Sequence, residues 1–445
     1  MLASLSRALN LAAALVAACT LVSIANAQAT SPAKPATTTK KPVTSSSKAK
    51  PKPATAAAKK PAKPAPPPPP PPPPSVELIG LIVMPADAFR AGPPSGQFDS
   101  EGRRAAAPRF EAQPVQGVSS IKPGATAGAW WALSDNGFGG KWNSSDYRLC
   151  IYLFDVRPRT EVGTDSRNAL QAIIELSDPA KFFPWRLADE NSEERLLTGL
   201  DADPESLVTM PDESFWVGDE FGPWMLHFSV DGELLAPPVE LPDNLRSVDH
   251  PLAITRADIP RLAHSRGLEA MDLAGDNQTL VSILEGTVGG DQPKTLRILR
   301  YDTVAGKWIG PTLIYELDPD TSSLTDMSRI DGNRFAVIER DDQQGDAARA
   351  KRVYSIDLDR AVPGKPLQKK LVIDLLSIGN SRGLVVTTPA GAPFRFPYLT
   401  TESIQVLDRK HVVIVNDNNY PATGGRGVNV KDATEWIWLE LANPL

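Results

Sequence analysis

The chain has 445 residues, of which 47 are Lys or Arg and 53 are Asp or Glu, so its formal net charge is −6. Residues 1–74 carry ten basic side chains and no acid, which leaves −16 for residues 75–445. Affinity for nucleic acid comes largely from cationic side chains that contact phosphates, so the acidity of residues 75–445 argues against nucleic acid as a partner. The same acidity suits a divalent cation as a ligand.

The first 27 residues have the pattern of a secretory signal peptide. A short basic start precedes an apolar run over residues 11–24, and small residues lead up to Ala27, after which we expect cleavage. The protein is therefore predicted to be exported, either to a periplasm or out of the cell. An alternative is that residues 16–19, Val-Ala-Ala-Cys, resemble a bacterial lipobox, which would anchor the protein to a membrane through lipid on Cys19.

Residues 28–74 form a tract of Lys, Pro, Ala and Thr that ends in nine consecutive prolines. The tract has almost no large apolar side chains, so it cannot build a core and is predicted to be a disordered linker. Proline repeats favour an extended chain of about 3.1 Å per residue, which makes the tract a stiff cationic tether. Its charge also allows a weak contact with an anionic envelope polymer or lipid.

From residue 75 onward, short β-type runs recur in pairs. In each pair the first run contains a carboxylate near its start and the second ends in an acid or an amide. The pairs are 205–210 with 215–220, 268–271 with 279–285, 324–327 with 334–339, and 402–407 with 411–417, and a fifth pair without the leading acid is 117–121 with 130–135. Recurrence of this kind predicts a β-propeller.

At about 50 residues for each blade, residues 75–445 predict a single propeller domain with six or seven blades. The apolar run at 76–83 is expected to close the ring by pairing with 435–441. A two-sheet β-sandwich is the alternative all-β architecture.

Four motifs resemble the family known as esterase-like activity of phytase, and the resemblance runs from about residue 76 to 442. They are Glu205-Ser206-Leu207 with the following Phe215–Gly232, Arg266-Gly267-Leu268-Glu269-Ala270-Met271, Ile338-Glu339-Arg340-Asp341, and Asn416-Asp417-Asn418-Asn419. Ser206 and Ala270 replace glycines that are common in the family. The resemblance implies an exported, propeller-like hydrolase of phosphoesters or other esters.

In a propeller the innermost strand of every blade lines one central channel, so acids at the same place in successive blades converge. Glu205, Glu269, Asp326 and Glu402 hold that place in the predicted blades. Several carboxylates that face one another cannot all stay ionised and dry without a cation, and calcium is the oxygen-preferring ion that resolves the conflict. The predicted ligand set also includes the carboxylates of Glu339 and Asp417. Asn136, Asn416 and Asn418 could add neutral oxygen ligands.

The predicted chemistry is hydrolysis of a small-molecule ester or phosphoester by a monomer. A free carboxylate, Glu269 or Asp219, would take a proton from water, while Arg266 and Arg340 would hold phosphate oxygens bidentately. The alternative is a propeller without catalytic activity that binds a protein or an envelope polymer and whose channel acids hold a structural ion.

Overall fold

The computed structural model describes residues 76–389 and 392–445, which belong to one compact unit. The predicted signal peptide, its lipobox alternative at Cys19 and the proline-rich linker all lie outside the described residues. Among the residues that are described, no helix is long and apolar enough to cross a membrane.

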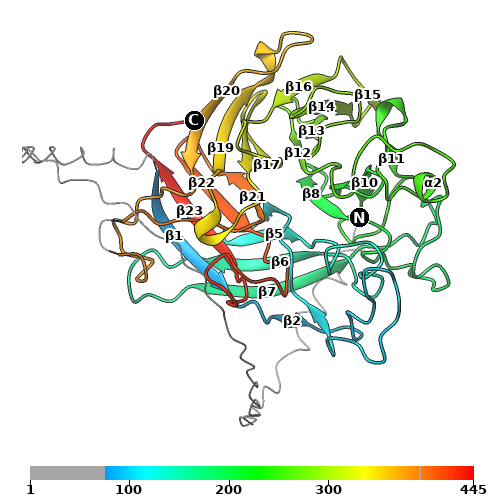
Figure 1. The fold of residues 1–445 in the computed structure, drawn as a ribbon, viewed down its shortest axis with the longest axis horizontal. Helices are drawn as coiled ribbons and strands as arrows, with labels where there is room; N and C mark the ends of the chain where they lie inside the picture. The colour runs from blue at the N-terminus through cyan, green and yellow to red at the C-terminus, as the bar shows by residue number, and fades with distance from the viewer. Residues whose placement is uncertain (1–75, 390–391) are drawn as a thin grey trace, which may run out of the picture. The chain divides into compact units, whose positions relative to one another are not determined.

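Five antiparallel sheets surround a common centre, which confirms an all-β propeller (Figure 1). Blade 1 is β4 (Ser120–Pro123), β5 (Ala129–Leu133), β6 (Cys150–Arg157) and β7 (Arg167–Glu175). Blade 2 is β8 (Pro204–Thr209), β9 (Phe215–Asp219), β10 (Trp224–Phe228) and β11 (Val239–Glu240). Blade 3 is β12 (Ala270–Leu273), β13 (Thr279–Ile283), β14 (Thr295–Asp302), β15 (Lys307–Trp308) and β16 (Leu313–Glu316). Blade 4 is β17 (Ser323–Asp331), β18 (Arg334–Arg340), β19 (Lys351–Asp357) and β20 (Lys369–Asp374).

Blade 5 joins the two ends of the described chain. It consists of β21 (Thr401–Val406), β22 (His411–Asn416), β23 (Thr434–Leu441) and β1 (Val76–Met84). Strand β1 runs antiparallel to β23, with a register from Val76 opposite Leu441 to Met84 opposite Thr434. The predicted ring closure is therefore confirmed.

The prediction of six or seven blades is wrong, because the propeller has five. Long connections take up residues that an estimate of 50 per blade assigns to strands. The stretches 176–203 and 241–269 and the described residues of 375–400 contain no blade strand. A further stretch between β1 and β4 contributes only the two-stranded ribbon of β2 (Phe89–Arg90) and β3 (Gln113–Pro114).

Helical structure is confined to short turns. The single α-helix of the described residues is α2 (Pro251–Ile254), and three 3-10 turns cover Pro242–Asn244, Gly345–Ala347 and Leu358–Arg360.

The hydrophobic core is divided into five clusters, one between each pair of adjacent blades. Successive side chains on a strand point to opposite faces of the sheet, so each strand feeds two clusters. On β22, Val412 and Ile414 pack toward blade 4, whereas Val413 and Val415 pack toward blade 1. Both faces of a blade are thereby buried.

The inner strands β4, β8, β12, β17 and β21 touch one another in sequence around the channel. Side-chain hydroxyl groups link neighbouring strands of this ring. Ser206 Oγ donates to the carbonyl oxygen of Leu268 at 3.0 Å, and Thr325 Oγ1 donates to that of Thr401 at 2.7 Å. These bonds fix the ends of the inner strands, where the acids of the candidate site lie.

Candidate functional site

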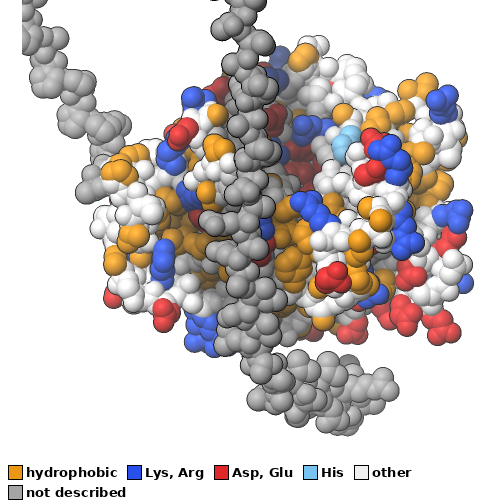
Figure 2. Space-filling view, turned by 60° about the horizontal axis from the view of Figure 1, so that its bottom comes forward, with side chains coloured by type: hydrophobic (Ala, Val, Ile, Leu, Met, Phe, Trp, Pro, Cys, Tyr) orange, Lys and Arg blue, Asp and Glu red, His pale blue; other side chains and the backbone are white. Residues whose placement is uncertain are grey.

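A cavity of about 160 Å³ opens at the end of the channel where the inner strands begin. It is lined by eight carboxylates and only two cationic side chains. The carboxylates are Asp135, Asp203, Glu205, Glu220, Glu269, Glu285, Glu402 and Asp417, and the cations are Arg266 and Arg340. In the space-filling view, acidic side chains lie at the floor of a hollow in the surface (Figure 2). We call this space the carboxylate cavity.

Backbone irregularities at the strand starts turn two of these acids into the channel. The pairing of β8 with β9 shifts register between Pro204 and Ser206, which places Glu205 in a β-bulge. The pairing of β21 with β22 shifts in the same way around Glu402. A bulge bends the strand and redirects its side chain. Glu269 directly precedes β12 and reaches the cavity from blade 3.

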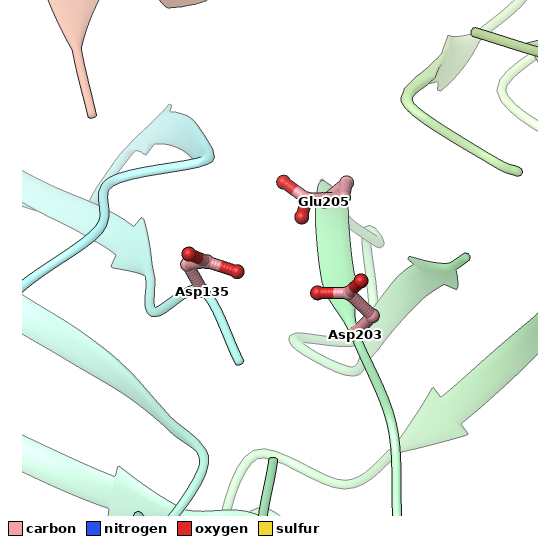
Figure 3. A group of neighbouring side chains, drawn as sticks. All are labelled: Asp135, Asp203 and Glu205. Atoms are coloured by element: carbon pink, nitrogen blue, oxygen red, sulfur yellow. The ribbon is translucent and has the colours of Figure 1, made fainter. Parts of the chain in front are cut away.

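Two groups of three carboxylates have the geometry of cation sites. Oxygens of Asp135, Asp203 and Glu205 all lie within 4.8 Å of one another, as do oxygens of Glu205, Glu220 and Glu269. Figure 3 shows Asp135, on the loop after β5, facing Asp203 and Glu205 across the channel. Glu205 belongs to both groups and therefore joins them.

Burial raises the pKa of these carboxyl groups, and their mutual repulsion adds to the effect. The pKa of Glu205 is well above 4.5, first because of desolvation and then because of the charges of Asp135 and Glu269. Desolvation likewise raises the pKa of Glu402, to about 7. An anionic cluster this crowded favours either bound protons or a bound cation.

Few hydrogen bonds relieve this repulsion. Asn136 Nδ2 donates to Asp203 Oδ1 at 2.7 Å, and the Gly267 amide donates to Glu220 Oε1 at 2.6 Å. No amide, hydroxyl or cationic donor of the described residues hydrogen-bonds to Glu205 or Glu269, although both are buried. The unpartnered oxygens are suited to a hard cation such as calcium.

Both cavity arginines pair with one carboxylate, Glu285. Arg266 forms an ion pair with Glu285 Oε2, and Arg340 Nη2 lies 3.3 Å from Glu285 Oε1. Arg340 Nη2 also lies 3.6 Å from Glu402 Oε1. Glu285 therefore bridges the two guanidinium groups, and Arg340 is also held by Asp342, whose Oδ1 lies 3.0 Å from Arg340 Nη1.

Asp326 does not join the cluster, contrary to the sequence-based expectation. The bulge of β17 lies between Leu324 and Met327, so Asp326 is two residues deeper along its strand than Glu205 or Glu402 along theirs. At about 3.3 Å per residue, that displacement is about 7 Å. Asp326 Oδ2 instead accepts the Ile404 amide at 2.8 Å, which satisfies a donor on the edge of the next inner strand.

Glu339 also lies outside the cavity, and the expected ligand role is not supported by its position. Alternation along β18 points Arg340 into the cavity and Glu339 between blades. There the Glu339 carboxylate accepts hydrogen bonds from the Tyr315 and Thr321 hydroxyl groups and pairs with Lys369. Its contacts are those of a structural residue.

Asp219 lies behind the cavity wall rather than in the cavity. Its two carboxylate oxygens accept the amides of Asp203 and Gly222, each at 2.7 Å. Burial raises its pKa to about 6, and these amides oppose the rise. Asp219 thus positions the segment that carries Asp203.

Among the asparagines expected as neutral ligands, Asn136 lines the cavity, but Asn416 and Asn418 do not. Asn416 accepts the Glu435 amide at 2.8 Å and Asn418 accepts that of Tyr420 at 3.1 Å, so both stabilise backbone. Two of the three predicted amide oxygens therefore accept hydrogen bonds from backbone amides of blade 5 and its loop.

Sequence reasoning missed Asp203 entirely. A signal was present, because Asp203 stands only two residues before Glu205, directly ahead of the same inner strand. Asp135, Glu220 and Glu285 are the last residues of the paired runs 130–135, 215–220 and 279–285, but they are not in the predicted ligand set. All three line the cavity.

Residues 113–420 match the Phytase-like family, described as esterase-like activity of phytase. The chain belongs to this family. Membership points to hydrolysis as the general class of activity, and it agrees with the resemblance carried by the sequence motifs.

An uncharacterized secreted protein of Arthroderma benhamiae is 22% identical over a region that covers 34% of this chain and 36% of that protein's length. Similar solved structures include a luciferin-regenerating enzyme, with 10% identity, 83% of this chain and 97% of that chain covered, and a TM-score of 0.40. The major allergen of Malassezia sympodialis also has 10% identity and the same coverages, with a TM-score of 0.38.

Proposed function

We propose that this phytase-like propeller is a calcium-dependent hydrolase of phosphoesters or other small esters, acting at the carboxylate cavity. The observation that carries the proposal is the pair of overlapping carboxylate groups joined by Glu205. These buried oxygens come from blades 1, 2 and 3, and the cavity offers them no cation except the two arginines that Glu285 engages.

Carboxylates of this kind fit calcium, which prefers six to eight oxygen ligands and tolerates irregular geometry. The residues that would hold the ion are Asp135, Asp203, Glu205, Glu220 and Glu269. A bound calcium ion supplies a Lewis acid for the ester oxygen and lowers the pKa of water.

The two cavity arginines bind the anionic part of the substrate. Arg340 lines the cavity, and its Nε atom is buried and has no hydrogen-bond partner among the described residues. Arg266 is about one-third exposed at the same cavity. Glu285 orients both guanidinium groups, which can then donate to two oxygens of one phosphate.

Glu402 is our candidate for proton transfer, in place of the Glu269 and Asp219 suggested by the sequence. The pKa of Glu402 is about 7, so the carboxyl group exchanges protons near neutral pH. Its neighbour Arg340 places it beside the expected position of the substrate oxygens. Glu269 is better used as a ligand, because its oxygen lies within the second carboxylate group.

The test is turnover by the purified full chain on a panel of phosphomonoesters, phosphodiesters, carboxylic esters and lactones, with calcium and with a chelator. We expect turnover that the chelator abolishes and that Glu205→Gln reduces at least a hundredfold. The control Glu316→Gln changes an exposed glutamate of β16 and should leave turnover unchanged.

Stabilisation by calcium without turnover of any panel member would reject the hydrolase. It would support the alternative of a non-catalytic propeller in which the ion is structural.

We also propose export of the protein, which the similarity to a secreted protein and the pattern of residues 1–27 support. The mass of the mature protein recovered after expression in a bacterium distinguishes cleavage after Ala27 from lipidation at Cys19. We further propose that the substrate is a small ester and that the protein is a monomer. We also propose that residues 28–74 make a salt-dependent contact with the cell envelope.

A further inference from the structure

A second cavity, of about 220 Å³, lies directly beside the carboxylate cavity. The two share Asp135, Gly139 and Asn419 as a common wall. The remaining lining differs in character: Phe98, Phe138 and Tyr420 are aromatic, and Gln116 contributes a carboxamide. Asp135 is the only acid in this lining and Arg109 the only cation, so the lining has no excess charge.

Gln116 is the unusual residue of this second cavity. It is 1% exposed, and neither its Oε1 nor its Nε2 makes a hydrogen bond of good geometry among the described residues, although the carboxamide lies close enough to the Tyr147 hydroxyl to lower the pKa of that tyrosine. The same hydroxyl lies 3.1 Å from that of Tyr152. A carboxamide has two donor hydrogens and an acceptor oxygen, and leaving buried polar atoms unpaired is costly.

The backbone beside Gln116 is held in an uncommon conformation. Gly117 and Val118 both have positive φ, at 83° and 92°, and the latter value is rare for a β-branched residue. A Cβ atom at Gly117 would lie 2.5 Å from the Asp135 amide nitrogen, so glycine is required where this turn meets the common wall. Strain of this kind persists where the surrounding structure imposes it, and it is frequent at ligand sites.

The aromatic side chains beside Gln116 are supported from behind. Phe110 stacks on Phe138 with ring centres 5.9 Å apart and also contacts Tyr420 at 5.5 Å. Phe98 and Phe138 are half-buried in the cavity wall. Flat apolar surfaces next to a free carboxamide are suited to a ring that has an apolar face and hydroxyl groups on its edge.

We propose that this second cavity is a subsite for a neutral hydroxylated ring of hexose type. The ring would stack on the aromatic wall, and two adjacent hydroxyl groups would satisfy the donor and the acceptor of Gln116. A volume of about 220 Å³ is below the ~300–1,000 Å³ of pockets for drug-sized ligands, so it suits a single ring. That the ring belongs to the ester cleaved at the carboxylate cavity rests on the proposed function.

Binding is tested without turnover, by saturation-transfer difference NMR on the full chain in chelator with D-glucose, D-galactose and D-mannose as separate probes. We expect at least one hexose to bind. Gln116→Leu keeps the size of the side chain and removes its hydrogen bonds, and it should weaken binding at least tenfold. Phe98→Ala should also weaken binding, because it removes part of the aromatic wall.

The matched control is Gln171→Leu, at an exposed glutamine of β7, which should bind the hexose as the unchanged protein does. Thermal unfolding of each variant shows whether it folds. If Gln116→Leu does not fold, the hexose binding of Phe98→Ala tests the proposal in its place. The subsite proposal would be overturned if no hexose binds, or if the two glutamine variants bind the hexose equally well. It would also be overturned if the protein binds p-nitrophenol in preference to all three hexoses.

Failure of the subsite and failure of the hydrolase give different results. Turnover without hexose binding rejects only the subsite, whereas hexose binding without turnover rejects the hydrolase and leaves a sugar-binding propeller.

Discussion

Lys122 of blade 1 and Asp272 of blade 3 form an ion pair inside the channel, with 3.4 Å between Nζ and Oδ2. The two blades are not neighbours in the ring, so the pair spans the channel. Asp272 Oδ2 also accepts the Arg329 amide at 2.7 Å. Lys122 is buried, and its charge opposes the rise in the pKa of Asp326 that desolvation causes.

Replacing this lysine should destabilise the fold. Lys122→Met keeps most of the apolar stem but leaves Asp272 without its cation, and removal of one partner of a buried ion pair costs about 3–5 kcal/mol. We expect a loss in the free energy of unfolding within that range, measured by urea denaturation. Lys307→Met, at an exposed position of β15, should change it little. Equal stability of the two variants would show that the channel pair contributes nothing.

The metal-free protein should lose stability as the pH rises toward neutrality. Burial raises the pKa of Glu402 from 4.5 to about 7. An acid with a higher pKa in the folded state stabilises the fold below its unfolded pKa, and this stabilisation is lost as the pH rises through the folded pKa. Ionisation of Glu402 alone should lower the free energy of unfolding by about 3 kcal/mol between about pH 4.5 and pH 7.

Excess calcium should reverse this trend, because it neutralises the ionised carboxylates. Melting temperatures measured in chelator and in calcium across the same pH window check the prediction. A melting temperature in chelator that rises over the window, with no effect of calcium, would contradict it.

Glu285 should act on substrate binding through the arginines. Glu285→Gln removes the charge that pairs with both arginines. Arg340 keeps its ion pairs with Asp342 and Glu402, so the loss of fixed orientation falls mainly on Arg266. We expect KM for a phosphoester substrate to rise about tenfold, since losing one charged hydrogen bond costs about 1.5–3 kcal/mol. A change in kcat with KM unaltered would instead place Glu285 among the groups that act in the chemical step.

Ring closure should depend on the buried face of β1. Leu78 is fully buried between blades 4 and 5, and Leu78→Ala should destabilise the fold by about 2–5 kcal/mol. Val83 on the same strand is 47% exposed, so Val83→Ala should cost less than about 0.5 kcal/mol. Denaturation curves that coincide for the two variants would mean that β1 is not needed to hold the ring together.

The sequence by itself predicted the strands, their pairing in hairpins and the closure of β1 onto β23. These features depend on local alternation of apolar side chains and on turn residues between them, and both are visible in a single chain. Blade number was not predictable in this way, because a count of residues does not distinguish a strand from a long connection such as 176–203.

The sequence also determined the chemical type of the site, since carboxylates at strand ends recur and the central channel of a propeller gathers them. Tertiary structure decided which of them meet. Glu205 and Glu402 enter the cavity through bulges at the strand start, whereas the later bulge of β17 carries Asp326 to the backbone of the next blade. The pattern of residue types does not reveal a shift of two residues along a strand. Such a shift nevertheless moves a carboxylate by about 7 Å, so that Asp326 makes a structural contact and is not a candidate ligand.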